Sequence, residues 1–146
     1  MANSQFRLVV EKYVRANIAQ ELGQAFRAAP VRLLDGGAFD CDAVSADDKI
    51  LGCICTNAGL TISGRCAAPK LHKVRSDILF LLRAHADRRM IVLTDKAMYD
   101  LCRRQALAGR MPAEIEFTFV PVPQAMQAQL RRSHEQAARE VTPATP

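Results

Sequence analysis

The chain opens with apolar residues spaced as in a helix. They recur every three to four positions across residues 6–26, which predicts an amphipathic helix with one apolar stripe. The pair Ala29-Pro30 is expected to end this helix, because the residue before a proline avoids helical geometry. A short strand is predicted at 31–34, followed by an Asp-Gly-Gly turn.

Two segments in the middle of the chain predict a hairpin. Residues 39–45 and 50–56 have the composition of strands, and a short polar linker with two aspartates separates them. With the turn centred on the two aspartates, Asp42 faces Cys53 and Asp40 faces Cys55. Side chains alternate along a strand, so this register places these four residues on one face of the sheet and Cys41 on the other.

After the hairpin, predicted helices alternate with predicted strands. Residues 57–68 are loop-like, with a short edge strand at 60–63, and Pro69 suits the first position of a helix. One stripe of that helix is formed by Leu71, Val74, Ile78, Leu81, Leu82 and His85. Residues 90–94 form a continuous apolar run, which is typical of a buried parallel strand.

The C-terminal third predicts a helix, an edge strand and a last helix. Thr94 or Asp95 is expected to cap the first helix and Gly109 to end it. Its apolar face is formed by Met98, Leu101, Cys102 and Leu107. Residues 115–122 alternate as a strand, in which Pro121 favours a sheet edge, and residues 124–141 form a polar helix. The order predicts one α/β domain over residues 1–140, with a mixed sheet flanked by helices and a flexible tail at 141–146.

Composition narrows the cellular setting. The 146 residues suffice for one domain with its own core, and no apolar run is long enough to cross a membrane. The N-terminus lacks the features of a signal peptide, and five cysteines without an export signal indicate a reducing compartment. We therefore expect a cytoplasmic protein with free thiols and no membrane contact.

The positive charge is concentrated in the middle third of the chain. The net charge is +5, and the segment 65–110 contains eleven Lys and Arg against four Asp, so it alone contributes +7. Such a basic patch suits a phosphate backbone, with Arg65, Lys70, Lys73 and Arg75 as the candidate nucleic-acid contacts. The alternative is that these side chains only make exposed helix faces soluble.

The predicted hairpin resembles the core of the PD-(D/E)xK nucleases, the restriction-endonuclease-like superfamily. The resemblance covers roughly residues 6–94 and rests on the order of elements and on the strands FDCDAVS and ILGCICT. It implies a restriction-endonuclease-like mixed sheet in which an Asp and a Glu hold Mg²⁺ and a Lys positions the attacking water. Asp42 or Asp40 occupies the Asp position, whereas Cys53 and Cys55 occupy the Glu and Lys positions. A thiol is a poor magnesium ligand and has no ammonium group, so the resemblance implies a degraded catalytic motif.

Neighbouring helices offer replacements for the missing groups. Some members of the superfamily supply them in this way. The candidates are Glu11 on the first helix and Lys70, Lys73 or Asp77 on the helix after the hairpin. An active enzyme would then bind Mg²⁺ through Asp42, Asp40 and Glu11. Lys73 and Asp77 are also one helical turn apart, which is the spacing of an ion pair.

Three functions remain open at this point. The first is a degenerate nuclease-like domain that binds DNA, RNA or a protein partner through its basic surface without cutting. The second is an active Mg²⁺-dependent nuclease with the migrated residues, and the third is a structural or regulatory homodimer that does not bind nucleic acid. A zinc site formed by the cysteines and His72 is disfavoured, since their spacing matches no common zinc pattern and buried cysteines are small apolar residues in most proteins.

Overall fold

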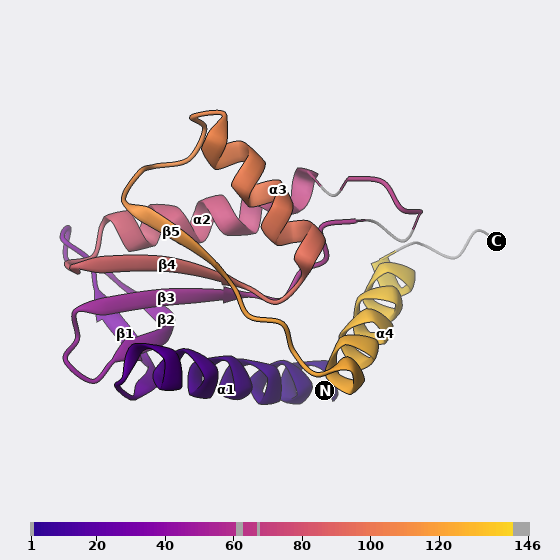
Figure 1. Cartoon of the computed structure of the whole chain (residues 1–146), viewed down its shortest axis with the longest axis horizontal. Coiled ribbons are helices and arrows are strands. Elements are labelled where there is room, and N and C mark those ends of the chain that lie inside the picture. Colours follow the sequence, from indigo (N-terminus) through magenta and orange to yellow (C-terminus); the bar gives the residue numbers. More distant parts are fainter. Residues whose placement is uncertain (1, 61–62, 67, 142–146) are drawn as a thin grey trace.

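A five-stranded mixed sheet with helices on both faces forms the molecule (Figure 1). The computed structural model describes residues 2–60, 63–66 and 68–141. Its elements, in chain order, are α1 (Ala2–Leu22), β1 (Phe26–Arg32), β2 (Ala38–Ser45), β3 (Ile50–Cys55), the 3-10 helix η1 (Ala68–Lys70), α2 (Leu71–Leu82), β4 (Arg88–Leu93), α3 (Lys96–Leu107), β5 (Ile115–Phe119) and α4 (Gln124–Val141). This order and the α/β class agree with the prediction from the sequence.

The strands lie in the sheet in the order in which they occur in the chain. β1, β2 and β3 are antiparallel neighbours, whereas β3, β4 and β5 run parallel to one another. A parallel connection requires a crossover, and here α2 joins β3 to β4 while α3 joins β4 to β5. The carboxyl ends of three strands therefore meet at one end of the sheet.

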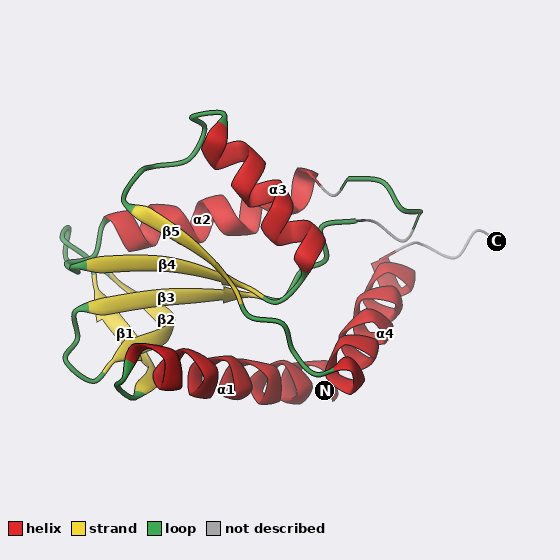
Figure 2. Ribbon diagram, in the orientation of Figure 1, coloured by secondary structure: helices red, strands yellow, loops and turns green. Residues whose placement is uncertain are grey.

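The sheet separates two hydrophobic cores, and each belongs to one pair of helices (Figure 2). On one face α2 and α3 pack on residues such as Leu51, Cys53 and Ile91. On the other face α1 and α4 pack on residues such as Ile50 and Ile54. Every residue of β3 is buried, because this strand lies at the centre of the sheet and both of its faces are covered.

The first helix and the first strand differ from the prediction. α1 ends at Leu22, before the expected end at 26, because Gly23 adopts a positive φ of 75° and its N–H bonds to the carbonyl of Ala19. β1 then begins at Phe26 and includes Pro30, which was expected to act only as a helix stop. A proline is tolerated there because β1 is an edge strand of the sheet.

Several local predictions are confirmed. The pairs Ala43–Gly52 and Val44–Leu51 have the predicted hairpin register, and α4 spans its predicted residues. Asp95 caps α3, Gly109 has a φ of 75° just after that helix, and β5 is an edge strand that is shorter than predicted. Leu107 is an exception, since it was assigned to the apolar face of α3 but is 80% exposed.

Two predicted segments fall partly or wholly outside the described residues. These are the short strand at 60–63, of which 61–62 are not described, and most of the tail at 141–146. Leu60 instead forms an isolated bridge with Cys66. Within the described part of the chain, no helix combines the length and the apolar character needed to cross a membrane.

Candidate functional site

Asp42, the predicted metal ligand, lies where β2 separates from β3. The last paired residues before this point are Ala43 and Gly52. Beyond this pair the Asp42 side chain provides the acceptor that a neighbouring strand would otherwise provide. Its Oδ2 accepts a hydrogen bond from the N–H of Ile54 at 2.8 Å. The carbonyl of Asp42 accepts a second hydrogen bond, from Arg15 of α1, at 3.0 Å. Asp42 therefore connects β2 to β3 and to α1.

The cysteine arrangement differs from the prediction at Cys41. We expected Cys41 to point away from Cys53 and Cys55, but all three thiols belong to the core beneath α2 and α3. The Cys41 thiol donates to the carbonyl of Gly52 at 3.3 Å and is hydrogen-bonded to the Cys53 side chain. The β1–β2 register shifts between Arg27 and Ala29, opposite this part of β2, and such an irregularity interrupts the alternation of side chains.

The thiols of Cys53 and Cys55, which the resemblance aligns with Glu and Lys, are buried and protonated. The hydrogen bond with Cys41, together with burial, raises the pKa of the Cys53 thiol above its ordinary value. Burial raises the pKa of the Cys55 thiol as well. Since the thiolate is the form that binds metal, neither side chain is prepared to act as a ligand at neutral pH.

Asp40 does not share the site with Asp42. Phe39 and Cys41, its neighbours in β2, both pack against the α2 and α3 core. Alternation along the strand therefore places Asp40 on the opposite face, where it is exposed and pairs with Pro30 of β1. The prediction that Asp40 faces Cys55 alongside Asp42 is wrong, because the irregularity in β2 changes the face of every residue before it.

Glu11 is buried, and its charge is compensated within its own helix. It is 6% exposed, and Arg7 binds its Oε1 through Nε at 3.0 Å. A buried carboxylate is retained in a protein only when it is paired in this way. The Arg7 charge also acts on Asp77 of α2. α1 and α2 cover opposite faces of the sheet, so this interaction acts across the sheet.

Lys73 and Asp77 form the ion pair that their spacing predicts. Lys73 Nζ lies 2.6 Å from Asp77 Oδ2. Burial raises the pKa of Asp77 above its ordinary value, and the negative charge of Asp42 acts in the same direction. Asp42, Lys73, Asp77 and Arg7 thus interact electrostatically. We call these four residues, with Glu11 as the ion-pair partner of Arg7, the Asp42 cluster.

The three remaining candidate residues are Lys70, Arg65 and Arg75, and they lie on different segments of the chain. Lys70 is the last residue of η1, and its charge acts on His134 of α4. Arg65 lies exposed in the loop before η1, and Arg75 is exposed on α2. The exposed positions of Arg65 and Arg75 leave their side chains accessible to a partner. The charge of Arg75 also acts on Cys102 of α3.

The donor set of the Asp42 cluster does not fit Mg²⁺. Its carboxylates already have partners within the chain, namely the Ile54 N–H, Arg7 and Lys73. The position that the resemblance aligns with the Glu ligand is a thiol here, Cys53, and a thiol is a poor Mg²⁺ ligand. Across the residues that the structure describes, no three His, Cys, Asp or Glu side chains are arranged to hold a metal ion.

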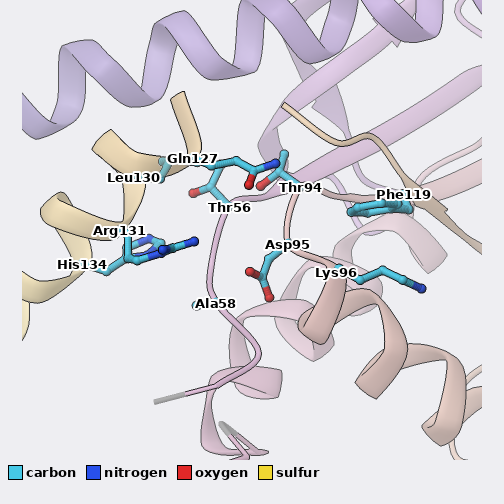
Figure 3. A pocket seen from close by; sticks show the side chains of 10 residues that line it. All are labelled: Thr56, Ala58, Thr94, Asp95, Lys96, Phe119, Gln127, Leu130, Arg131 and His134. Carbon is cyan, nitrogen blue, oxygen red and sulfur yellow. The ribbon is translucent and has the colours of Figure 1, made fainter. Parts of the chain in front are cut away.

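A cavity that was not predicted from the sequence opens at the carboxyl ends of β3 and β4 (Figure 3). Its volume is about 260 Å³, and the polar side chains around it include Thr56, Thr94, Asp95, Arg131 and His134. Thr56 and Thr94 each directly follow a buried strand, which is the one local signal that the sequence contains. The residues from α4 carry no such signal, because nothing local shows that α4 returns to this point.

Comparison of the chain with protein-family models, curated proteins and solved structures finds no match.

Proposed function

We propose that the chain is a catalytically degenerate domain of the restriction-endonuclease-like type that binds nucleic acid through the face covered by α2 and α3. One observation carries the proposal: the carboxylate at the family's Asp position is hydrogen-bonded to the backbone of β3, beside buried thiols at the Glu and Lys positions. A group that would hold a metal in an active relative holds two strands together instead.

The order of the elements supports the fold part of the proposal. A helix, a three-stranded meander, a helix and a parallel strand are the features on which the resemblance rests, and the chain has them in that order. The predicted hairpin register, which aligned the two family strands, agrees with the pairs Ala43–Gly52 and Val44–Leu51.

The distribution of basic side chains supports the binding part. Some of the eleven Lys and Arg in 65–110 are compensated: Lys73, Arg83, Arg88 and Lys96 form ion pairs. Arg89 binds the carbonyls of Leu81 and Ala84 at the end of α2. Arg75, Arg103 and Arg104 are exposed on α2 and α3, two helices that cover the same face of the sheet. Exposed guanidinium groups on helices that cover one face suit the phosphates of a nucleic acid.

Fluorescence anisotropy with labelled duplex DNA and single-stranded RNA, over a series of salt concentrations, tests this proposal. We expect salt-dependent binding that the double variant Arg75→Gln/Arg103→Gln weakens roughly tenfold, with a salt dependence shallower by about one unit per lost phosphate contact. The matched control is Lys12→Gln/Arg132→Gln, which removes the same charge from exposed positions on α1 and α4.

The control makes the result decisive. If both double variants lose the same affinity, the effect is one of net charge and the proposed surface is wrong. If the unaltered chain shows no salt-dependent binding, the function is not nucleic-acid recognition, and a structural or regulatory homodimer becomes the explanation to examine by sedimentation.

An active nuclease is the second candidate, because the Asp42 cluster joins a carboxylate of β2 to Lys73 and Asp77 of α2. The test is cleavage of the same substrates with Mg²⁺ and Mn²⁺, using Asp42→Asn, which keeps an oxygen to accept from Ile54 N–H. We expect no cleavage from either protein. Metal-dependent cleavage that is lost in Asp42→Asn and in Lys73→Gln would overturn degeneracy and leave the fold proposal standing.

A further inference from the structure

The cavity at the carboxyl ends of β3 and β4 is built by segments far apart in the chain. Thr56 and Thr94 follow these strands, Asp95 begins α3, and Arg131 and His134 lie on α4 (Figure 3). In open α/β sheets, ligands bind outside the carboxyl ends of parallel strands. The volume of about 260 Å³ has room for roughly nine water-sized volumes, so the cavity suits a small molecule.

Thr94 provides an observation that itself points to a ligand. The residue is 4% exposed and lines the cavity, and its Oγ1 has no hydrogen-bond partner among the described residues. A buried hydroxyl without a partner costs free energy, so it calls for a partner such as an ordered water or a ligand. Because Oγ1 is itself buried, the Thr94 side chain must turn toward the cavity for a ligand hydroxyl to satisfy it.

Asp95 forms a fixed acceptor on the same wall. Its Oδ2 accepts hydrogen bonds from the N–H groups of Met98 and Gly59, at 2.9 and 2.8 Å. These bonds hold the side chain in place at the edge of the cavity, as Figure 3 shows, and do not use Oδ1. A ligand hydroxyl is the natural donor to that second oxygen.

Arg131 gives the opposite wall a positive charge. Arg131 and His134 lie about one turn apart on α4, and in Figure 3 the Arg131 guanidinium extends toward the space between α4 and the strand ends. Burial lowers the pKa of His134, and the nearby charge of Lys70 lowers it further, so at neutral pH this side chain offers a neutral N–H donor to an anion. Lys96 does not contribute here, because its Nζ binds Asp100 at 2.8 Å and points away from the cavity. An anion would therefore bind at the α4 wall.

We propose that this cavity binds a phosphate monoester on a hydroxyl-bearing sugar, with Arg131 and His134 on the phosphate and Thr94 and Asp95 on the hydroxyl groups. The two walls together require a phosphate and a hydroxyl group in one molecule. A sugar that carries a phosphate monoester occurs in a free sugar phosphate or nucleotide and at the 5′ end of a nucleic-acid strand. The inference does not depend on the proposed nucleic-acid surface, which lies on α2 and α3.

Calorimetric titration of the full chain with ribose 5-phosphate tests the proposal, with ribose and inorganic phosphate as partial probes. We expect ribose 5-phosphate to bind most tightly and Arg131→Gln to weaken it roughly tenfold or more. Thr94→Val should weaken it by a smaller factor, since it removes one hydroxyl while keeping the shape of the side chain. The control is Arg132→Gln, the next residue of α4, which is exposed and does not line the cavity.

Oligonucleotides with a 5′-phosphate or a 5′-hydroxyl identify the source of the ligand. Binding of ribose 5-phosphate points to a free ester, whereas binding of the 5′-phosphorylated strand alone, lost in Arg131→Gln, points to a strand end. Absence of binding by every phosphorylated probe, or equal losses in Arg131→Gln and Arg132→Gln, would overturn the proposal. Failure of Arg75→Gln/Arg103→Gln to affect duplex binding would refute the proposed function and leave this result unchanged.

Discussion

At the scale of single residues, two buried hydroxyl groups show how differently the same chemical group is used. Ser45 is fully buried, and its Oγ donates to Asp47 at 2.6 Å and accepts from the N–H of Ile50 at 2.9 Å. These bonds close the turn between β2 and β3. Thr94 is almost as deeply buried, but its hydroxyl has no partner within the described residues. One hydroxyl stabilises the fold, and the other has no bond within the described residues through which it could do so.

Removal of the two hydroxyls should affect the free energy of unfolding differently. Ser45→Ala leaves the Ile50 N–H unpaired and should lower the free energy of unfolding by about 1–3 kcal/mol. Thr94→Val removes a buried hydroxyl that has no bond to lose, and should leave that free energy unchanged or raise it by up to about 1 kcal/mol. Urea denaturation of the two variants gives both values. A loss at Thr94 as large as that at Ser45 would show that Thr94 has a structural partner.

At the scale of elements, Asp95 joins the start of α3 to the loop after β3. It accepts from Met98 N–H as the helix cap and from Gly59 N–H in the loop. The approach is so close that a Cβ at Gly59 would lie 2.2 Å from the Met98 nitrogen. Only glycine fits at this point, because a side chain would push the loop away from the helix. This contact shapes one wall of the cavity.

Removal of the Asp95 carboxylate should loosen both elements together. We expect Asp95→Ala to lower the free energy of unfolding by about 1–2 kcal/mol for the helix cap, and further for the lost bond to the loop. Asp95→Asn keeps one acceptor and should cost less. The control is Asp100→Ala, which removes only an exposed ion pair with Lys96 and should cost less than about 1 kcal/mol. Equal losses in Asp95→Ala and Asp100→Ala, measured by urea denaturation, would contradict the double role of Asp95.

At the scale of the whole molecule, the sheet is unevenly protected. β3 and the last four residues of β4 are buried, since helices cover both faces at the centre of the sheet. β1 lies at the edge, and all of its residues are exposed or only half-buried. The stability of the molecule should therefore rise from the β1 edge toward the centre of the sheet.

Hydrogen exchange of the native protein, followed residue by residue, measures this gradient. Amides in β3 and β4 should exchange slowest, at rates set by global unfolding, whereas amides in β1 should exchange through local opening. Moderate urea should therefore increase the exchange rates of β3 amides more steeply than those of β1 amides. Equal protection of β1 and β3 would mean that the edge is covered in solution, as a homodimer formed through β1 would do.

Local rules accounted for much of this fold. The hairpin between β2 and β3, the Asp95 cap and the stop at Gly109 depend on residues that are close in the chain, and all three were predicted. The end of α1 was misplaced even though its signal, Gly23, is present in the sequence, because Pro30 was given more weight. The pairing of Lys73 with Asp77 was also predictable from a single helical turn.

The surroundings of the candidate sites were decided by the tertiary structure. The irregularity in β2 turned Cys41 toward Cys53 and Asp40 away from Asp42, and it depends on how β2 pairs with β1. The cavity requires α4 to lie beside the ends of β3 and β4, which no local pattern encodes. The sequence alone determined the order of elements and the class of the fold, because periodicity and turn chemistry act over a few residues. Which side chains meet was determined only by packing, because those contacts join residues that are distant in the chain.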